Sequence, residues 1–505
     1  MCDKRKITWI TYFSLCLIVL MGSMLFYGTL FIVDTFGNVT ADALVFHLFA
    51  PLDGQNPLIV YDALTGILAS SVFIVRLYVY LLLLSLLVSK FLEEFRTAVN
   101  LSKKTVRIVP FVWLTYTAFF VNAQLDLADY FRLAFTDSMF IENNYIDPRA
   151  VQITFPEVKR NLILIYLESI ETSFMSVAEG GGSETNLIPE LTDLAYQHTH
   201  FSNTDLFGGF QEVAGTGWTV AGMVASTSGL PLIVSPLLRD ATDGGGNMMG
   251  TFDYFLPGAY PLGRVLERVG YSNYLLVGSD ARFGGRDRYF SQHGNHRILD
   301  VYTAEDYLII PEGHRVFWGM EDEHLFTFAR QQLSIISQRD EPFNFTMLTV
   351  DTHFPDGWVS SYTPNYYARQ YSNVLRGSSR QVYEFIQWIS TQDWFENTTI
   401  IIIGDHLSMQ ADVPDYLYEG HERTIFNVII NSQATGHQYH NRTFTTMDWF
   451  PTILAAMGIE VEGNRLGLGT NLFSDEYTLA ERYGLDYLNQ QLLQRSRFYL
   501  SLNLP

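Results

Sequence analysis

Long apolar runs are confined to the first quarter of the chain, at residues 9–33, 69–89 and 106–124. Each run is close to or above the roughly 20 residues that cross the hydrocarbon core of a bilayer, so the pattern predicts three transmembrane helices. A removable signal peptide is the rival interpretation of residues 9–33, but that stretch is too long and no small-residue cleavage site follows it. Residues 41–51 are apolar but too short to span, which predicts an interfacial or re-entrant segment.

The basic residues predict how these spans are oriented. Lysine and arginine gather at residues 4–6 and again at residues 90–107, whereas residues 34–68 contain neither. Because cytoplasmic loops are enriched in these residues, we expect a multi-pass inner-membrane protein with everything after about residue 125 outside the cytoplasm. Arg76 lies within the second apolar run, where snorkelling, pairing inside the bundle and a functional role are all compatible with the sequence.

From about residue 158 the pattern changes to short β-rich runs that alternate with amphipathic segments. Nearly continuous apolar strands between helices are typical of a parallel sheet covered on both faces. The sequence therefore predicts an α/β domain with a mostly parallel central sheet, joined to the N-terminal transmembrane helices. The expected strands are 161–167, 271–278, 343–350, 398–404 and 426–431, and the expected helices are 188–197, 261–269, 322–338 and 377–391.

These patterns give a division into four parts. We expect a membrane domain over residues 1–125, a linker over 126–157, an extracytoplasmic catalytic domain over 158–475 and a short helical tail over 476–505. A chain of this length is expected to form more than one folded unit.

Composition narrows the classes of function. The chain is 48% hydrophobic and 15% aromatic, which suits a protein partly in lipid, and its formal net charge of -21 makes nucleic acid an unsuitable partner. Any phosphate must therefore bind in a local basic pocket. The two cysteines, Cys2 and Cys16, both precede the outer domain. That domain consequently has no disulfide framework, thiolate metal site or cysteine nucleophile.

Polar residues follow the expected strands at three points: Glu168, Thr352-His353 and Asp405-His406. In open α/β sheets, ligands bind beyond the carboxyl ends of the strands. Glu168, Asp405 and His406 could hold one divalent cation, with Thr219 of the GTGWT segment as a further ligand whose hydroxyl becomes a nucleophile. Taken singly, a carboxylate after a strand is more often a helix-start or surface charge, and a threonine in such a turn is more often a cap.

Five segments, in order, resemble a known family: IYLESIETSF, GTGWTVAGMVASTSGLPL, GYSNYLLVGSDARFGGRDRYFSQHG, LTVDTHFPDG and IIIIGDHLSM. They are similar to the membrane-bound phosphoglycerol transferases of the alkaline phosphatase superfamily, whose sulfatase-like members include an enzyme that decorates periplasmic glucans and, more distantly, lipoteichoic acid synthase. The resemblance covers about residues 158–475 and implies the same α/β fold.

The resemblance also implies roles for individual residues. Thr219 would be the nucleophile that carries a covalent phosphoglycerol group, and Thr216 is the rival hydroxyl three residues upstream. Arg286 and His353 match positions that bind the substrate phosphate. The metal ligands would be Glu168, Thr219, Asp405 and His406. Oxygen and nitrogen ligands without sulfur favour Mn²⁺, and also suit Mg²⁺ or Zn²⁺.

One position departs from the family. Lipoteichoic acid synthase has an aromatic residue two positions before the arginine, where this chain has Gly284, and Phe283 is a candidate substitute. Arginine grips phosphate bidentately, and the same loop also carries Arg282 and Arg288. A solvated loop balanced by Asp280 and Asp287 is the alternative interpretation. Arg423 is expected either to face the site or to form an ion pair, and His293 is expected to be structural.

These inferences give one leading function and several rivals. The leading function is transfer of sn-glycerol 1-phosphate from phosphatidylglycerol to a periplasmic glucan or another envelope glycan. A phosphoethanolamine transferase has the same scaffold but usually has disulfides in its outer domain. A phosphodiesterase differs only in using water as acceptor. A sulfatase is disfavoured because TVAGM (219–223) lacks the cysteine or serine that becomes formylglycine. A non-catalytic lipid sensor is disfavoured because the ligand set is intact.

Overall fold

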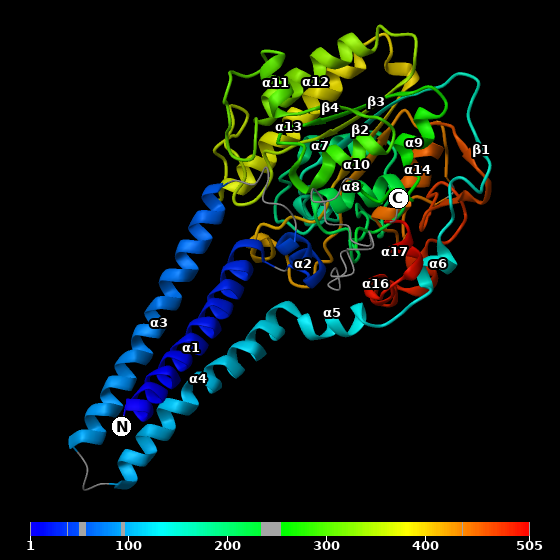
Figure 1. Cartoon of the computed structure of the whole chain (residues 1–505). Helices are drawn as coiled ribbons and strands as arrows, with labels where there is room; N and C mark the ends of the chain where they lie inside the picture. Colours follow the sequence, from blue (N-terminus) through cyan, green and yellow to red (C-terminus); the bar gives the residue numbers. More distant parts are fainter. Residues whose placement is uncertain are drawn as a thin grey trace. The chain divides into compact units, whose positions relative to one another are not determined.

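The computed structural model describes residues 2–37, 39–49, 57–91, 96–233, 254–436 and 438–503 (Figure 1). The chain forms two compact units. One comprises Met1–Ala41 with Asn56–Asp129, and the other comprises Asp42–Gln55 with Tyr130–Pro505. The segment after the first long helix therefore belongs to the second unit, although the sequence places it between two membrane spans.

The first unit consists of three long helices, α1 (Cys2–Phe36), α3 (Pro57–Phe91) and α4 (Arg96–Leu125). Each contains a stretch that is long and apolar enough to cross a membrane, at Ile10–Phe36, Ala63–Val88 and Lys104–Leu125. The prediction of three apolar N-terminal helices is confirmed.

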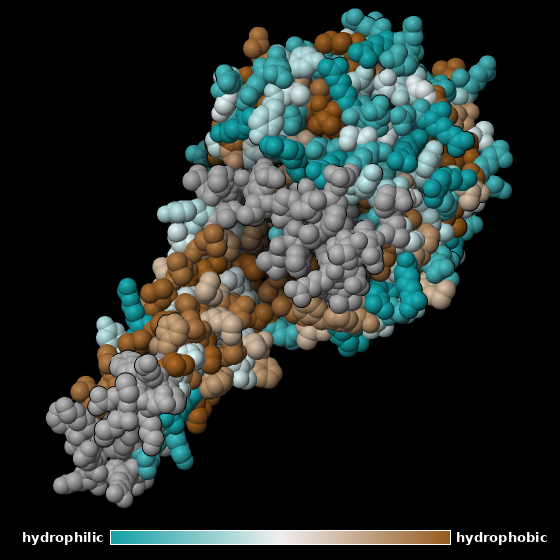
Figure 2. Space-filling view, viewed as in Figure 1, coloured by the Kyte–Doolittle hydropathy of each residue, from teal (hydrophilic) through white to brown (hydrophobic). Residues whose placement is uncertain are grey.

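The helices of the first unit pack through a small core and leave most of their apolar side chains exposed. The Tyr78 hydroxyl donates to the Val106 carbonyl at 2.9 Å inside this bundle. Phe13 and Phe119 are 66% and 74% exposed, and the helices are coloured largely as apolar surface in Figure 2. Such a surface suits lipid rather than water. Arg76 is exposed on α3.

The second unit is built on a six-stranded sheet with the order β4-β3-β5-β2-β6-β7. Its first five strands are parallel, and β7 runs antiparallel to β6 at the edge. The mostly parallel sheet expected from the sequence is confirmed. The strands are β2 (Asn161–Leu167), β3 (Ser272–Val277), β4 (Arg297–Leu299), β5 (Phe343–Leu348), β6 (Thr398–Gly404) and β7 (Asn427–Ile430).

Helices cover both faces of the sheet, which is why its strands are apolar throughout. On one face, α7 (Pro189–Gln197), α12 (Asp322–Ile336) and α13 (Gln370–Ser390) share a core with Ile163 and Ile165 of β2. On the other, Tyr166 hydrogen-bonds Ser226 of α8 at 2.6 Å. Helix α8 (Thr219–Ser228) contacts α9 (Leu262–Glu267) and α14 (Trp449–Ala456), and it hydrogen-bonds α10 (Arg286–Gln292).

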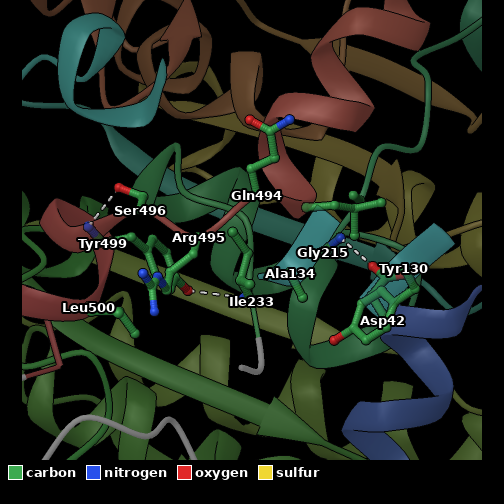
Figure 3. Close-up of a pocket in the computed structure, with 12 residues that line it drawn as sticks. Asp42, Tyr130, Ala134, Gly215, Ile233, Gln494, Arg495, Ser496, Tyr499 and Leu500 are labelled. Atoms are coloured by element: carbon green, nitrogen blue, oxygen red, sulfur yellow. Dashed lines mark hydrogen bonds between the residues drawn. The ribbon is translucent and has the colours of Figure 1, made fainter. Parts of the chain in front are cut away.

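Helix α2 (Ala41–Phe49) packs into the second unit just before the start of α8. The Asp42 carboxylate accepts a hydrogen bond from the Gly215 backbone N–H at 2.7 Å, as Figure 3 shows, and the Phe46 ring lies 4.6 Å from that of Trp218. Asp42, Ala43, Val45 and Phe46 are all buried. This packing was not predicted for the 41–51 segment, of which residues 50 and 51 lie outside the described residues.

The C-terminal tail also packs on the second unit through α15 (Leu479–Tyr483), α16 (Leu485–Leu493) and α17 (Arg497–Ser501). Leu488 and Leu492 are fully buried. The Tyr499 hydroxyl donates to the Pro231 carbonyl at 2.8 Å. The same hydroxyl accepts from the Ile233 N–H at 3.1 Å (Figure 3). The remaining helices are α5 (Leu127–Ala134), α6 (Phe140–Asn144) and α11 (Val301–Asp306). Two small antiparallel pairs join β1 (Ile153–Thr154) with β8 (Glu460–Val461), and β9 (Arg465–Leu466) with β10 (Gly469–Thr470).

Candidate active site

The carboxyl ends of β2 and β6 bring Glu168, Asp405 and His406 together. The two strands are neighbours, and Leu167 is paired with Gly404, so the residues that follow them leave the sheet side by side. All three side chains are buried, with residue exposures of 2%, 1% and 2%. One ligand atom from each lies within 4.8 Å of the other two, an arrangement that suits a bound cation.

The surrounding backbone fixes the orientation of these ligands. His406 Nε2 lies 3.5 Å from Glu168 Oε1 and 3.4 Å from Asp405 Oδ2, and His406 Nδ1 lies 2.7 Å from the Leu407 carbonyl. Because Nδ1–H donates to that carbonyl, the ring is held with Nε2 directed toward the carboxylates, where it can donate when protonated and bind a cation when it is not. Asp405 Oδ1 accepts from the Ser169 and His406 N–H groups, whereas Oδ2 is buried and has no hydrogen-bond partner among the described residues. This unpaired oxygen fits a cation ligand.

Thr219 is the first residue of α8 and completes the cluster. Its Oγ1 lies 3.4 Å from both Glu168 Oε2 and His406 Nε2. Gly222 permits this approach, because a Cβ added there would lie 2.1 Å from the Asp405 carbonyl oxygen. The rival hydroxyl of Thr216 is fully buried, and it donates to the Val213 carbonyl at 2.8 Å. The structure thus brings Thr219, and not Thr216, to the two strand ends.

Burial and mutual charge set the protonation of the cluster. Burial and the charge of Glu168 raise the pKa of Asp405 to about 7. Burial would also raise the pKa of Glu168, but the positive charges of His353 and His406 lower it to about 2. Burial by itself would lower the pKa of His406, but the negative charges of Asp405 and Glu168 outweigh burial and raise this pKa to about 10. Without a cation the cluster therefore holds protons, which a divalent ion would replace.

Arg286, the first residue of α10, is buried and held by three hydrogen bonds. Its Nη2 donates to Ser279 Oγ and to the Asp280 carbonyl, each at 2.9 Å, and its Nε donates to the Phe283 carbonyl at 3.0 Å. Burial lowers its pKa to about 10, while Glu168 and other acidic groups act in the opposite direction. The guanidinium therefore stays positively charged at neutral pH, and it interacts electrostatically with the Glu168 carboxylate.

His353 follows β5 and lies beside an aromatic residue that the sequence did not predict. Burial lowers the pKa of His353, and the negative charge of Glu168 opposes that shift. The Trp318 ring lies 4.3 Å from the His353 ring, and the Phe283 ring lies 6.1 Å from Trp318. The Arg286 guanidinium lies 5.6 Å from the Phe283 ring. Phe283 and Trp318 thus place aromatic surface beside the two predicted phosphate-binding residues, although position 284 is glycine.

Other basic residues singled out by the sequence have ordinary partners. Arg282 pairs with Asp280 at 2.7 Å on the surface, as expected for a solvated loop. Arg423 forms an ion pair with Glu171, with its Nε 2.8 Å from Glu171 Oε2, which decides between the two interpretations of that residue. His293 Nε2 lies 2.7 Å from the Phe255 carbonyl and the residue is buried, as a structural histidine would be.

A residue of α2 also lies near the site and was missed. The His47 ring lies 6.5 Å from that of Trp218, the residue before Thr219. Burial lowers the pKa of His47 to about 4, and positive charge on His406 and His353 contributes. His47 is therefore a neutral imidazole close to both of these histidines. Nothing in its sequence context could have indicated this, because 172 positions separate it from Thr219 (219 − 47).

Known proteins are similar in sequence to much of the second unit. The family model described as Sulfatase matches residues 160–459. Proteins named phosphoglycerol transferase I from Salmonella choleraesuis and Salmonella paratyphi B are each 30% identical over 331 residues, which is 64% of this chain but 40% of each relative. The matched part of the chain therefore spans less than half the length of these relatives.

Solved structures also show similarity. A protein in the alkaline phosphatase superfamily from Vibrio parahaemolyticus has a TM-score of 0.49 and 19% identity, covering 71% of this chain and 81% of its own. The lipoteichoic acid synthase LtaP from Listeria monocytogenes has a TM-score of 0.49 and 18% identity, covering 64% and 79%.

The Sulfatase match extends over more than half of the 505 residues. It runs from the start of β2 past β7, and it includes all four residues of the strand-end cluster, Glu168, Thr219, Asp405 and His406. The chain therefore belongs to the sulfatase family, as its motifs predicted.

Proposed function

We propose that this protein is a membrane-bound phosphoglycerol transferase, which moves sn-glycerol 1-phosphate from phosphatidylglycerol to a hydroxyl of a periplasmic glucan or another envelope glycan. The observation that carries the proposal is the Thr219 hydroxyl, 3.4 Å from both Glu168 and His406, at the start of a helix. The name of the Salmonella relatives supports phosphoglycerol as the transferred group.

The transfer takes place in two displacements at phosphorus. Thr219 Oγ1 bonds to the phosphorus, the bond from phosphorus to the diacylglycerol oxygen breaks, and the threonine proton ends on the released diacylglycerol. An acceptor hydroxyl then bonds to the same phosphorus, the bond to Thr219 breaks, and the acceptor proton returns to the threonine. Two displacements of this kind conserve all atoms and leave the enzyme unchanged.

The residues around Thr219 have distinct parts in this scheme. Glu168, whose pKa is about 2, remains a carboxylate that accepts from the threonine hydroxyl. Arg286 and His353 bind the phosphate oxygens. A divalent cation held by Glu168, Thr219, Asp405 and His406 would lower the pKa of the hydroxyl and offset phosphoryl charge. Mn²⁺ is the ion we propose, and Mg²⁺ and Zn²⁺ also suit oxygen and nitrogen ligands.

The orientation predicted by the basic residues places the second unit on the periplasmic side, where its lipid donor and glycan acceptor meet. Protease added outside intact spheroplasts should then cut within residues 126–505. Protection of that whole region from the outside, with cleavage after lysis, would overturn the orientation.

The function is tested by the intact mass of the full chain after incubation with Mn²⁺ and phosphatidylglycerol. Wild type should gain a glycerol-phosphate adduct and release diacylglycerol, whereas Thr219→Ala should do neither. Thr216→Ala is the matched control and should keep the adduct. An adduct formed only with phosphatidylethanolamine would instead assign a phosphoethanolamine transferase, and diacylglycerol release with no acceptor but water would assign a phosphodiesterase. A protein that reacts with neither lipid would overturn all three assignments, namely the phosphoglycerol transferase, the phosphoethanolamine transferase and the phosphodiesterase.

A further inference from the structure

A second cluster of metal-ligand side chains lies at the start of α12. His314 comes from the segment between α11 and α12, Glu321 immediately precedes α12, and His324 lies in its first turn. His314 Nε2 is 2.7 Å from Glu321 Oε2, and His324 Nε2 is 3.5 Å from Glu321 Oε1. One ligand atom from each lies within 4.8 Å of the other two, and the cluster shares no residue with the site at Glu168.

The types and positions of these residues suit zinc. Two imidazoles and one carboxylate are a recurring set of protein ligands for Zn²⁺, with water in the fourth position. Glu321 precedes α12 with an extended backbone, and its side chain turns toward His324 of the first helical turn, with 3.5 Å between Oε1 and Nε2. Their side chains and that of His314 are 10%, 35% and 25% exposed, so solvent reaches the cluster.

The nearest arginine in the sequence does not neutralise Glu321. Arg315 forms its ion pair with Glu305 of α11, and its guanidinium lies 4.7 Å from the Tyr302 ring. Among the described residues, Glu321 forms ion pairs with His314 and His324 alone. Asp322 is turned away as well, because its carboxylate accepts from the backbone N–H groups of Val350 and Asp351. Glu321 thus remains the carboxylate that faces both imidazoles.

The cluster closes a loop that reaches the active site. Residues 315–320 lie between its ligands and carry Trp318, whose ring lies 4.3 Å from His353 and whose Nε1 donates to the Phe354 carbonyl at 3.2 Å. The Met320 N–H donates to the carbonyl oxygen of Gly278, the residue directly after β3. A Cβ added to Gly319 would lie 2.1 Å from this same oxygen, so the two segments are in close contact. The loop therefore contacts the carboxyl end of β3 through Gly319 and Met320, and it contacts His353 through Trp318.

We propose that His314, Glu321 and His324 bind a zinc-class divalent cation, and that this ion fixes the loop that packs Trp318 against His353. An ion held from both ends of the loop reduces the conformations open to residues 315–320. This site is structural with respect to transfer, since its ligands differ from those around Thr219. The proposal does not depend on the proposed function.

The test is the zinc content of the full chain in detergent, after chelator treatment, Zn²⁺ loading and desalting. The Glu168→Ala/His406→Ala double variant removes the other candidate site and should retain one zinc ion per chain. Adding His324→Ala should remove that ion, whereas adding His198→Ala, a histidine outside both clusters, should not. Equal zinc content with and without His324, or none in the double variant, would overturn the proposal.

A ligand exchange separates metal binding from a hydrogen-bonding role of His324. In the same double-variant background, His324→Cys should restore the bound ion that His324→Ala loses, and with Co²⁺ it should add a thiolate charge-transfer band. Hydrogen exchange of residues 315–320 should slow when Zn²⁺ is added to the double variant, and not when it is added to the variant that also carries His324→Ala. Failure of cysteine to restore the ion, or exchange in this loop that is insensitive to zinc, would contradict the assignment.

Discussion

The two clusters of histidine and carboxylate in the second unit differ in how far their charged groups are exposed to solvent. At the ends of β2 and β6, two carboxylates and one imidazole have side chains no more than 3% exposed. At the start of α12, one carboxylate and two imidazoles are 10% to 35% exposed. Water can solvate the second cluster but not the first. A buried excess of negative charge must be balanced by protons or by a cation, whereas an exposed triad is stable with or without an ion.

The comparison is tested most strongly by removing a carboxylate from the buried cluster. Glu168→Ala should reduce bound metal and lower turnover by about three orders of magnitude or more, because both the cation and the Thr219 hydroxyl lose a partner. Glu384→Ala is the control, since its pair with Arg380 is exposed and should contribute little. Steady-state transfer and metal content measure both variants. Full activity of Glu168→Ala would remove the buried cluster from catalysis.

A smaller effect is expected from displacing Thr219, the proposed nucleophile, without removing any of the proposed ligands. Gly222→Ala puts a Cβ 2.1 Å from the Asp405 carbonyl oxygen, so α8 and Thr219 must shift away from the cluster. A displacement of about 1 Å at the reacting group costs on the order of 100-fold in rate. Gly66→Ala makes the same change on α3, where nothing lies within 4 Å of the added Cβ, and should leave turnover unchanged. Equal rates for the two variants would show that the close approach is not needed.

The pH dependence of metal binding should report the protons held by the buried cluster. Since the pKa of His406 is about 10, a cation must displace its proton, and the apparent affinity should rise as pH increases from 7 toward 10. The expected slope is about tenfold per pH unit for one proton. Below pH 7 the slope should steepen, because Asp405 has a pKa of about 7 and adds a second proton. Mn²⁺ titrations at several pH values measure this, and a flat profile would exclude His406 as a ligand.

The smallest effect is expected in the exposed cluster without metal. His324→Ala should change the free energy of unfolding by less than about 1 kcal/mol, as for most exposed side chains. With Zn²⁺ at about 100 times the dissociation constant, the chain with His324 should gain about 2.7 kcal/mol in its free energy of unfolding. The chain with His324→Ala should not gain it. Thermal unfolding with and without zinc, in the Glu168→Ala/His406→Ala background, compares the two. A large metal-free loss would mean that the histidine supports the fold directly.

Local sequence patterns predicted the sheet well because its strands are covered on both faces. The expected strands 161–167 and 398–404 coincide with β2 and β6. The direction of β7 was not predicted, since apolar periodicity is the same for parallel and antiparallel strands. Strand β4 was missed because it has three residues and begins with an exposed arginine. The prediction worked where burial is complete and failed where a strand is short or at an edge.

The residues of the candidate site likewise fall into those that the sequence could group in advance and those that it could not. Glu168, Asp405 and His406 could be grouped in advance because parallel strands end at one edge of a sheet. Trp318 could not, since its position beside His353 depends on a loop closing between two distant segments. The second cluster had one local signal, the spacing of Glu321 and His324 at the start of an expected helix. His314 joins them only through the fold of that loop.

The packing of α2 bears on how the second unit should be isolated. A fragment that starts at residue 130 would lack Asp42 and Phe46, which contact Gly215 and Trp218 in the turn just before Thr219. Its Gly215 N–H would lose a charged acceptor and the Trp218 ring would lose an aromatic neighbour, although every residue of the strand-end cluster would be present. Fusing residues 41–49 to the start of such a fragment, or supplying them as a peptide, is therefore a rational way to isolate the second unit with the turn before Thr219 intact.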